Sequence, residues 1–106
     1  MFVVLVATDR PGSMALRART KERHKQYLDA GAPDLKVLQS GPLLATDGSE
    51  RGSLIVFEAN SVEYVHTFVE EDPYFRAGLF EAIEIQPWDW RRGNPYLSTN
   101  DKEIPK

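Results

Sequence analysis

The stretch Phe2-Val3-Val4-Leu5-Val6-Ala7 is an apolar run without polar alternation, a pattern typical of a central β-strand covered on both faces. The run ends at Asp9-Arg10-Pro11-Gly12, a strong turn sequence. Ser13 can then cap a helix that continues to Gly31. Because the apolar run is far too short to span a bilayer and has no basic segment before it, we interpret it as a buried strand and not as a targeting signal.

A β-hairpin is predicted after this helix. The segment 37–44 has extended character, but Gly41-Pro42 interrupts it, because proline cannot donate to a sheet ladder. This favours a bulged or edge strand. Asp47-Gly48-Ser49 has the composition of a hairpin turn, and residues 52–58 form the returning strand.

A second helix and a last strand complete the pattern. Asn60 and Glu63 have the spacing of a capping box at the start of the helix. Asp72-Pro73 ends it, because proline disturbs a continuing helix. A short turn over residues 74–78 and a strand over residues 80–88 follow. The apolar stripe of the second helix consists of Val62, Val65, Phe68 and Val69.

The resulting order, β-α-β-β-α-β, predicts an α+β domain with a ferredoxin-like split βαβ fold. Its four-stranded antiparallel sheet would carry both helices on one face. The strands are too apolar for the other face to remain bare in water, so we expect two copies to dimerise through the sheet. We assign residues 1–97 to this single domain, including an aromatic segment from Trp88 to Leu97, and residues 98–106 to a polar C-terminal tail.

Composition narrows the class of protein. A net charge of −3 over 106 residues disfavours nucleic acid as the main ligand. The basic residues between Arg17 and Lys25 are interrupted by Glu22, and we interpret them as the solvated face of a helix. The chain has no cysteine, which excludes disulfides and thiolate chemistry and is compatible with the cytoplasm. No histidine spacing suits a metal site, so we expect neither metal nor organic cofactor, and no membrane partner.

His24 is the first candidate for chemistry. It lies in the middle of the apolar stripe of the first helix, so the imidazole points inward. Such a ring can be a packed core residue whose nitrogens bond to backbone, or a general acid or base, since its ordinary pKa of about 6.5 allows proton exchange near neutrality. His66 falls on the flank of the second stripe and is expected to face solvent.

Asp72 is the second candidate. Asp followed by Pro is a favoured N-cap and N1 pair, which is sufficient to explain the residue structurally. A carboxylate fixed by backbone donors can also orient a neighbouring imidazole, so capping and catalysis can coexist.

Four stretches in this order resemble the YciI-like family of the dimeric α+β barrel superfamily, which also includes muconolactone isomerase. They are the opening strand with Asp9, the first helix with Arg17 and His24, the run Ser40-Gly41-Pro42-Leu43, and Glu71-Asp72-Pro73-Tyr74 with Ala77-Gly78-Leu79-Phe80. A His and an Asp are proposed as the active centre of this family, and His24 and Asp72 match them. A dehydrochlorinase acting on chlorinated hydroxyhydroquinones resembles the same family. The resemblance implies proton-transfer chemistry on small, polar, often aromatic molecules.

We therefore expect a dimeric small-molecule enzyme that moves a proton without a cofactor, as a lyase of the dehydrochlorinase type or as an isomerase. His24 would be the acid or base and Asp72 would orient it. Ser40, Gly41 and Tyr74 would line the pocket, and Arg17 would attract an anionic group. The alternative is a non-catalytic module that binds a metabolite or another protein.

Overall fold

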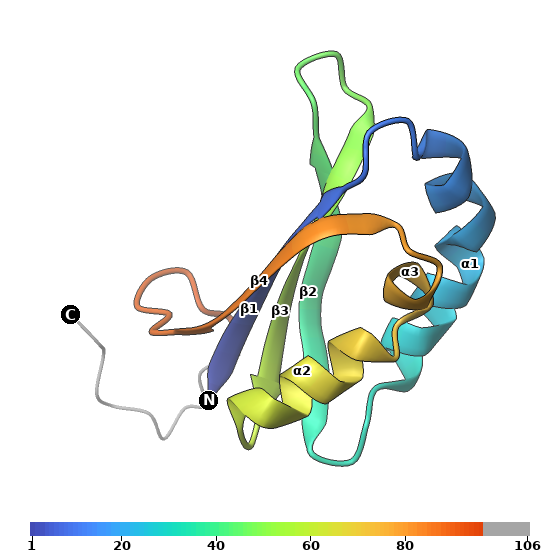
Figure 1. Ribbon diagram of the computed structural model, residues 1–106. Helices are drawn as coiled ribbons and strands as arrows, with labels where there is room; N and C mark the ends of the chain where they lie inside the picture. Colours follow the sequence, from blue (N-terminus) through green and yellow to red (C-terminus); the bar gives the residue numbers. More distant parts are fainter. Residues whose placement is uncertain (97–106) are drawn as a thin grey trace.

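The computed structural model describes residues 1–96, which form one antiparallel sheet with helices packed on one of its faces (Figure 1). The strand order is β2-β3-β1-β4. This confirms the predicted α+β split βαβ fold. Within these residues no helix is both long and apolar enough to cross a membrane. In chain order the elements are β1 (Phe2–Asp9), α1 (Met14–Ala30), β2 (Leu35–Leu44), β3 (Glu50–Ala59), α2 (Val62–Glu70), α3 (Pro73–Arg76) and β4 (Phe80–Trp88).

Strand β1 is buried on one face only. Val3, Leu5 and Ala7 are fully buried beneath the helices. Val4 and Val6 point to the opposite face and are only partly buried. The expectation that β1 is covered on both faces is therefore wrong for a single chain, because all helices pack on the same side of the sheet.

Strand β2 is an edge strand, as the sequence predicts, and it is bulged. The register with β3 shifts between Val37 and Gln39, which leaves Leu38 as the extra residue, and again between Leu43 and Leu44. Pro42 lies in the ladder opposite Ser53, where an edge strand tolerates the missing N–H. The bulges therefore flank the Gly41-Pro42 pair.

Gly52 allows β3 to approach β1 closely. A Cβ atom at this position would lie 2.3 Å from the carbonyl oxygen of Ala7. No side chain fits there without moving backbone. The preceding hairpin turn is closed by Ser49, whose backbone N–H donates to the Asp47 carboxylate at 2.9 Å.

The cap of α2 differs from the prediction by one residue. Ser61, and not Asn60, is the N-cap, and its hydroxyl accepts from the Tyr64 N–H at 3.4 Å. Asn60 instead donates its side-chain amide to the Asp34 carboxylate at 3.0 Å. The long-range contact therefore occupies the side chain that the capping box would have used.

Beyond β4 the chain folds back as a loop on the face of the sheet that carries no helix (Figure 1). Trp90 is buried there and packs edge-on against Phe2, with ring centroids 5.5 Å apart. Trp88 stacks on Trp90 at 4.6 Å, and the Tyr96 hydroxyl donates to the Leu38 carbonyl at 2.9 Å. The predicted polar tail, residues 98–106, lies outside the described residues.

Candidate functional site

The face of α1 that lies over the sheet is unusually polar. Its buried residues are Arg17, Thr20, His24 and Leu28, of which only the last is apolar. These polar side chains do not fill the space between the helix and the sheet as a stripe of apolar side chains would. A cavity of about 270 Å³ remains between α1, α3 and the strands β2 and β3.

His24 and Asp72 meet beside this cavity. His24 Nδ1 lies 2.9 and 3.0 Å from the two carboxylate oxygens of Asp72, and both side chains are buried. An ionised carboxylate can only accept, so the neutral imidazole donates from Nδ1 and carries its lone pair on Nε2. Among residues 1–96 the only buried, unpaired side-chain nitrogen or oxygen is Asn94 Nδ2. His24 Nε2, which has no protein partner in that range, is therefore accessible from the cavity.

Asp72 has both of the roles that the sequence allows. It is the N-cap of α3, and its Oδ1 accepts from the Tyr74 backbone N–H at 2.8 Å. The same oxygen faces His24 Nδ1. Because the cap fixes the carboxylate to the backbone, the imidazole is held in one tautomer and one orientation.

Tyr74 forms a wall of the site. Its ring stacks on the His24 imidazole with centroids 3.9 Å apart, and the guanidinium of Arg17 lies 4.7 Å from its ring centre. Burial raises the pKa of the Tyr74 hydroxyl above its ordinary value, although the charge of Arg17 acts in the opposite direction. The hydroxyl is therefore protonated near neutral pH and can donate a hydrogen bond.

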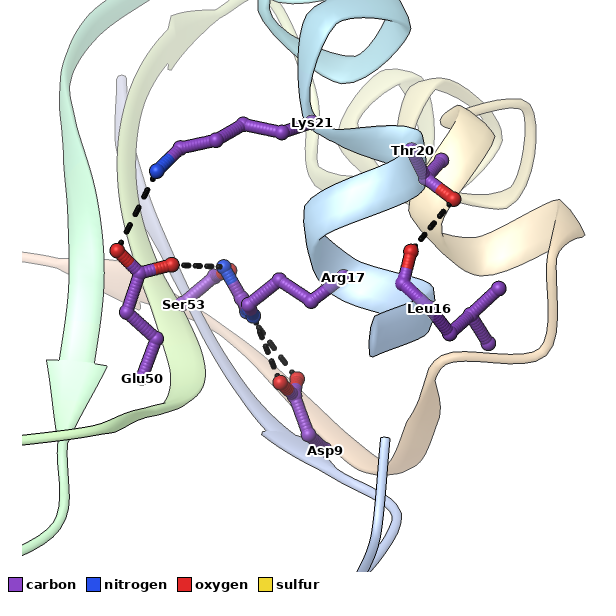
Figure 2. Close-up of polar contacts among 7 residues, drawn as sticks. All are labelled: Asp9, Leu16, Arg17, Thr20, Lys21, Glu50 and Ser53. Atoms are coloured by element: carbon purple, nitrogen blue, oxygen red, sulfur yellow. Dashed lines mark hydrogen bonds and ion pairs between the residues drawn. The ribbon is translucent and has the colours of Figure 1, made fainter. Parts of the chain in front are cut away.

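Arg17 is anchored by its own partners (Figure 2). It donates to Asp9 through Nε at 2.7 Å and to the Ser53 hydroxyl at 2.7 Å, and it lies 3.8 Å from Glu50. Burial alone would lower the pKa of Arg17, but the hydrogen bond to Asp9 and the nearby negative charges raise it. Arg17 is thus a buried, charge-compensated side chain that ties α1 to β1 and β3.

Of the basic residues of α1, Arg17 is buried and the others are exposed, as predicted. Lys21 and Lys25 line the cavity together with Arg17, at intervals of one helical turn. Lys21 extends to the Glu50 carboxylate at 3.3 Å (Figure 2). Lys21 and Lys25 are thus exposed at the rim of the cavity, whereas the exposed Arg19 and Arg23 do not line it.

All six residues singled out from the sequence lie at this cavity: five line it directly, namely Arg17, His24, Ser40, Gly41 and Tyr74, and Asp72 holds His24. Sequence reasoning missed Glu50, Ser53 and the ion-pair role of Asp9. Ser53 could have been found from the sequence, because alternation along β3 places it on the same inward face as Ile55 and Phe57. Glu50 could not have been found in this way, since it precedes the predicted strand over residues 52–58.

His66 is exposed on α2, as expected. Within residues 1–96 no group of three or more His, Cys, Asp or Glu side chains could hold a metal ion.

A family model for the YCII-related domain matches residues 1–89. The chain belongs to this family. Protein YciI from Escherichia coli is 27% identical over 94 residues, covering 83% of this chain and 96% of its own. An uncharacterised protein from Haemophilus influenzae is 23% identical over 94 residues, which again cover 83% of this chain and 96% of its own.

Solved structures agree with this assignment. The 5-chloro-2-hydroxyhydroquinone dehydrochlorinase TftG from Burkholderia phenoliruptrix, in complex with 2,5-dihydroxybenzoquinone, is 34% identical, with a TM-score of 0.75 over 84% of this chain and 94% of its own. SnoaB, a cofactor-independent oxygenase from Streptomyces nogalater, has a TM-score of 0.51 over 89% of this chain and 94% of its own at 16% identity, which indicates a shared fold.

Proposed function

We propose that this protein is a cofactor-independent enzyme that transfers a proton on a small hydroxylated ring, as a dehydrochlorinase-type lyase or as an isomerase. The observation that carries the proposal is the buried His24–Asp72 pair, with Nδ1 bonded to the carboxylate and Nε2 accessible from the cavity. A base held in this tautomer is ready to accept a proton from a bound molecule.

His24 Nε2 removes a proton from a ring hydroxyl, and a proton is returned to a neighbouring ring carbon. This step alone is a tautomerisation. Where that carbon carries chlorine, removal of a second hydroxyl proton shifts electrons through the ring, and the C–Cl electron pair leaves with chloride. The net loss is one proton and one chloride, so the electrons balance within the substrate and no oxidant is needed. Tyr74 donates to an oxygen of the ring, and Ser40 and Gly41 shape the opposite wall.

Two further facts support this substrate class. A cavity of about 270 Å³ is at the small end for ligand sites, which suits a single ring. The 34% identical TftG is a dehydrochlorinase for 5-chloro-2-hydroxyhydroquinone, and the alignment extends over 94% of its chain.

The test is chloride release from 5-chloro-2-hydroxyhydroquinone under anaerobic conditions, which prevent autoxidation of the substrate. Positioned acid or base catalysis typically contributes about 10² to 10⁴ in rate, so His24→Ala should lose activity by that factor. His66→Ala is the matched control, because it removes an exposed imidazole from α2. Full activity of His24→Ala would contradict the mechanism. Saturable binding of 2,5-dihydroxybenzoquinone without turnover of any hydroxylated ring would favour the non-catalytic alternative.

We also propose that two copies pack through the free face of the sheet. This face has a hollow of about 360 Å³ lined mainly by apolar side chains from three strands, including Val4, Val6, Leu54 and Val56. Leu54 is 38% exposed and Trp88 is 40% exposed in the single chain. An exposed apolar patch on a sheet is typical of an interface.

A further inference from the structure

Lys25 lines both the cavity at His24 and a second hollow beside it. This hollow is a groove of about 370 Å³ along the seam between α1 and β2, and it shares Lys25, Leu28 and Ser40 with the cavity. Its β2 wall contains the bulge at Leu38, the residue whose carbonyl accepts from Tyr96. The two hollows are therefore adjacent, and the second has room for a ring substituent.

The three cations of the cavity differ in how far their charge is compensated. Arg17 is paired with the buried Asp9 at 2.7 Å. Lys21 extends to Glu50 at 3.3 Å. Within residues 1–96 the one ion pair of Lys25 is with Glu22, at 3.7 Å. The two side chains are 59% and 77% exposed, so this pair contributes little in water. Lys25 is thus the cation most able to bind an anion from a ligand.

The charges also limit where such an anion can lie. Asp29, one helical turn beyond Lys25, also lines the groove and repels a carboxylate placed beside it. Leu28 offers an apolar contact at the junction. A carboxylate on a short stem that passes Leu28 and ends at Lys25 uses the apolar contact and stays away from the charge of Asp29.

We propose that the substrates of this site carry a carboxylate on a short stem attached to the hydroxylated ring, and that Lys25 recognises this carboxylate. The inference rests on the proposed function, since it places the ring at His24. It reassigns anion recognition from Arg17, whose charge is already compensated, to Lys25. Lys25 is a specificity-determining residue and takes no part in the proton transfer.

The test compares 2,5-dihydroxyphenylacetate with its methyl ester, in which a methyl group replaces the negative charge, by isothermal titration calorimetry under anaerobic conditions. The acid should bind about fivefold more tightly than the ester, the upper end for an ion pair that remains open to solvent. Lys25→Gln should reduce this ratio to about one. Arg23→Gln is the matched control, because it removes a neighbouring cation of α1 that does not line the cavity, and it should keep the ratio.

Equal binding of acid and ester, an unchanged ratio in Lys25→Gln, or no binding of either probe would overturn the inference. These outcomes are distinguishable from failure of the proposed function. Chloride release together with equal binding of the two probes would support the proposed function and contradict recognition of a carboxylate. A fivefold ratio without turnover of any hydroxylated ring would support Lys25 as the recognition residue of a binding site and remove the catalysis.

Discussion

Replacing Asp72 by Asn should reverse the tautomer of His24 without removing the cap of α3. In the wild type the carboxylate accepts from both the Tyr74 N–H, at 2.8 Å, and His24 Nδ1, at 2.9 Å. An Asn side chain has only one oxygen. If this oxygen keeps the cap in the Oδ1 position, the amide NH₂ takes the place of Oδ2, 3.0 Å from His24 Nδ1, and can only donate. An imidazole with its proton on Nδ1 would meet this donor, so we expect the ring to accept at Nδ1 and to carry its proton on Nε2, where the proposed base needs a lone pair.

Two magnitudes follow from this geometry. Loss of the base should lower the rate of proton transfer by about 10² to 10⁴, the range for a positioned general acid or base. Loss of a charge-assisted hydrogen bond should lower the free energy of unfolding by about 1.5 to 3 kcal/mol. The rate should therefore fall by far more than the folded fraction does.

The assay is nitrogen-detected NMR of the histidine rings at a pH where both are neutral, together with urea unfolding. His24 should change from the Nδ1-protonated to the Nε2-protonated form in Asp72→Asn. His66, exposed on the far helix, is an internal reference in the same spectrum and should not change. An Nε2-protonated His24 in the wild type, or an unchanged tautomer in the variant, would refute the reasoning whatever the substrate is.

Three further predictions concern the scaffold. Gly52→Ala should lower the free energy of unfolding, measured in urea, by about 1 to 3 kcal/mol, because its Cβ would lie 2.3 Å from a backbone oxygen. Gly41→Ala is the control and should change this free energy far less, since a Cβ there has no neighbour within 4 Å; equal effects would contradict the close approach. Tyr27 donates to the Phe68 carbonyl at 2.7 Å, and burial raises its pKa to about 12. The folded state therefore holds this proton more tightly than the unfolded state, so the associated stability is intact below about pH 10 and is lost as the pH rises through about 12. Tyr27→Phe should lack this alkaline loss, and a variant that keeps the wild-type profile would contradict the assignment. Light scattering at micromolar concentration should give the mass of a dimer for the wild type and the mass of a monomer for Leu54→Asp. The reason is that the interface would bury the new charge at this exposed apolar position. A monomeric wild type would disprove the dimer.

The helices and strands were predictable because most of them are specified by local patterns. The apolar run 2–7, the turn at Asp47-Gly48-Ser49 and the Asp72-Pro73 break each lie where the structure places a strand, a turn and a helix start. The misplaced cap of α2 shows the limit of local reasoning. Asn60 and Ser61 are both good N-caps by type, and a contact with Asp34, 26 residues away, decided between them.

The inward direction of His24 was predictable from helical periodicity, and the position of Asp72 from the proline that follows it. The apolar stripe expected around His24 was wrong, because three of the four buried residues of α1 are polar. The role of Arg17 could not be predicted in the same way, because the compensation of its charge depends on Asp9 at the end of β1 and on Glu50 at the start of β3. No spacing along the chain reveals that two carboxylates have already neutralised a cation.

The sequence by itself determined the order of the elements, the inward direction of His24 and the capping geometry of Asp72, since each depends on residues within a few positions of one another. Only the tertiary structure decided that the imidazole and the carboxylate, 48 residues apart, lie 2.9 Å from each other. It also decided which of the three cations that line the cavity has the least compensated charge, because compensation depends on the distances between the helix and the strands and falls as those distances grow.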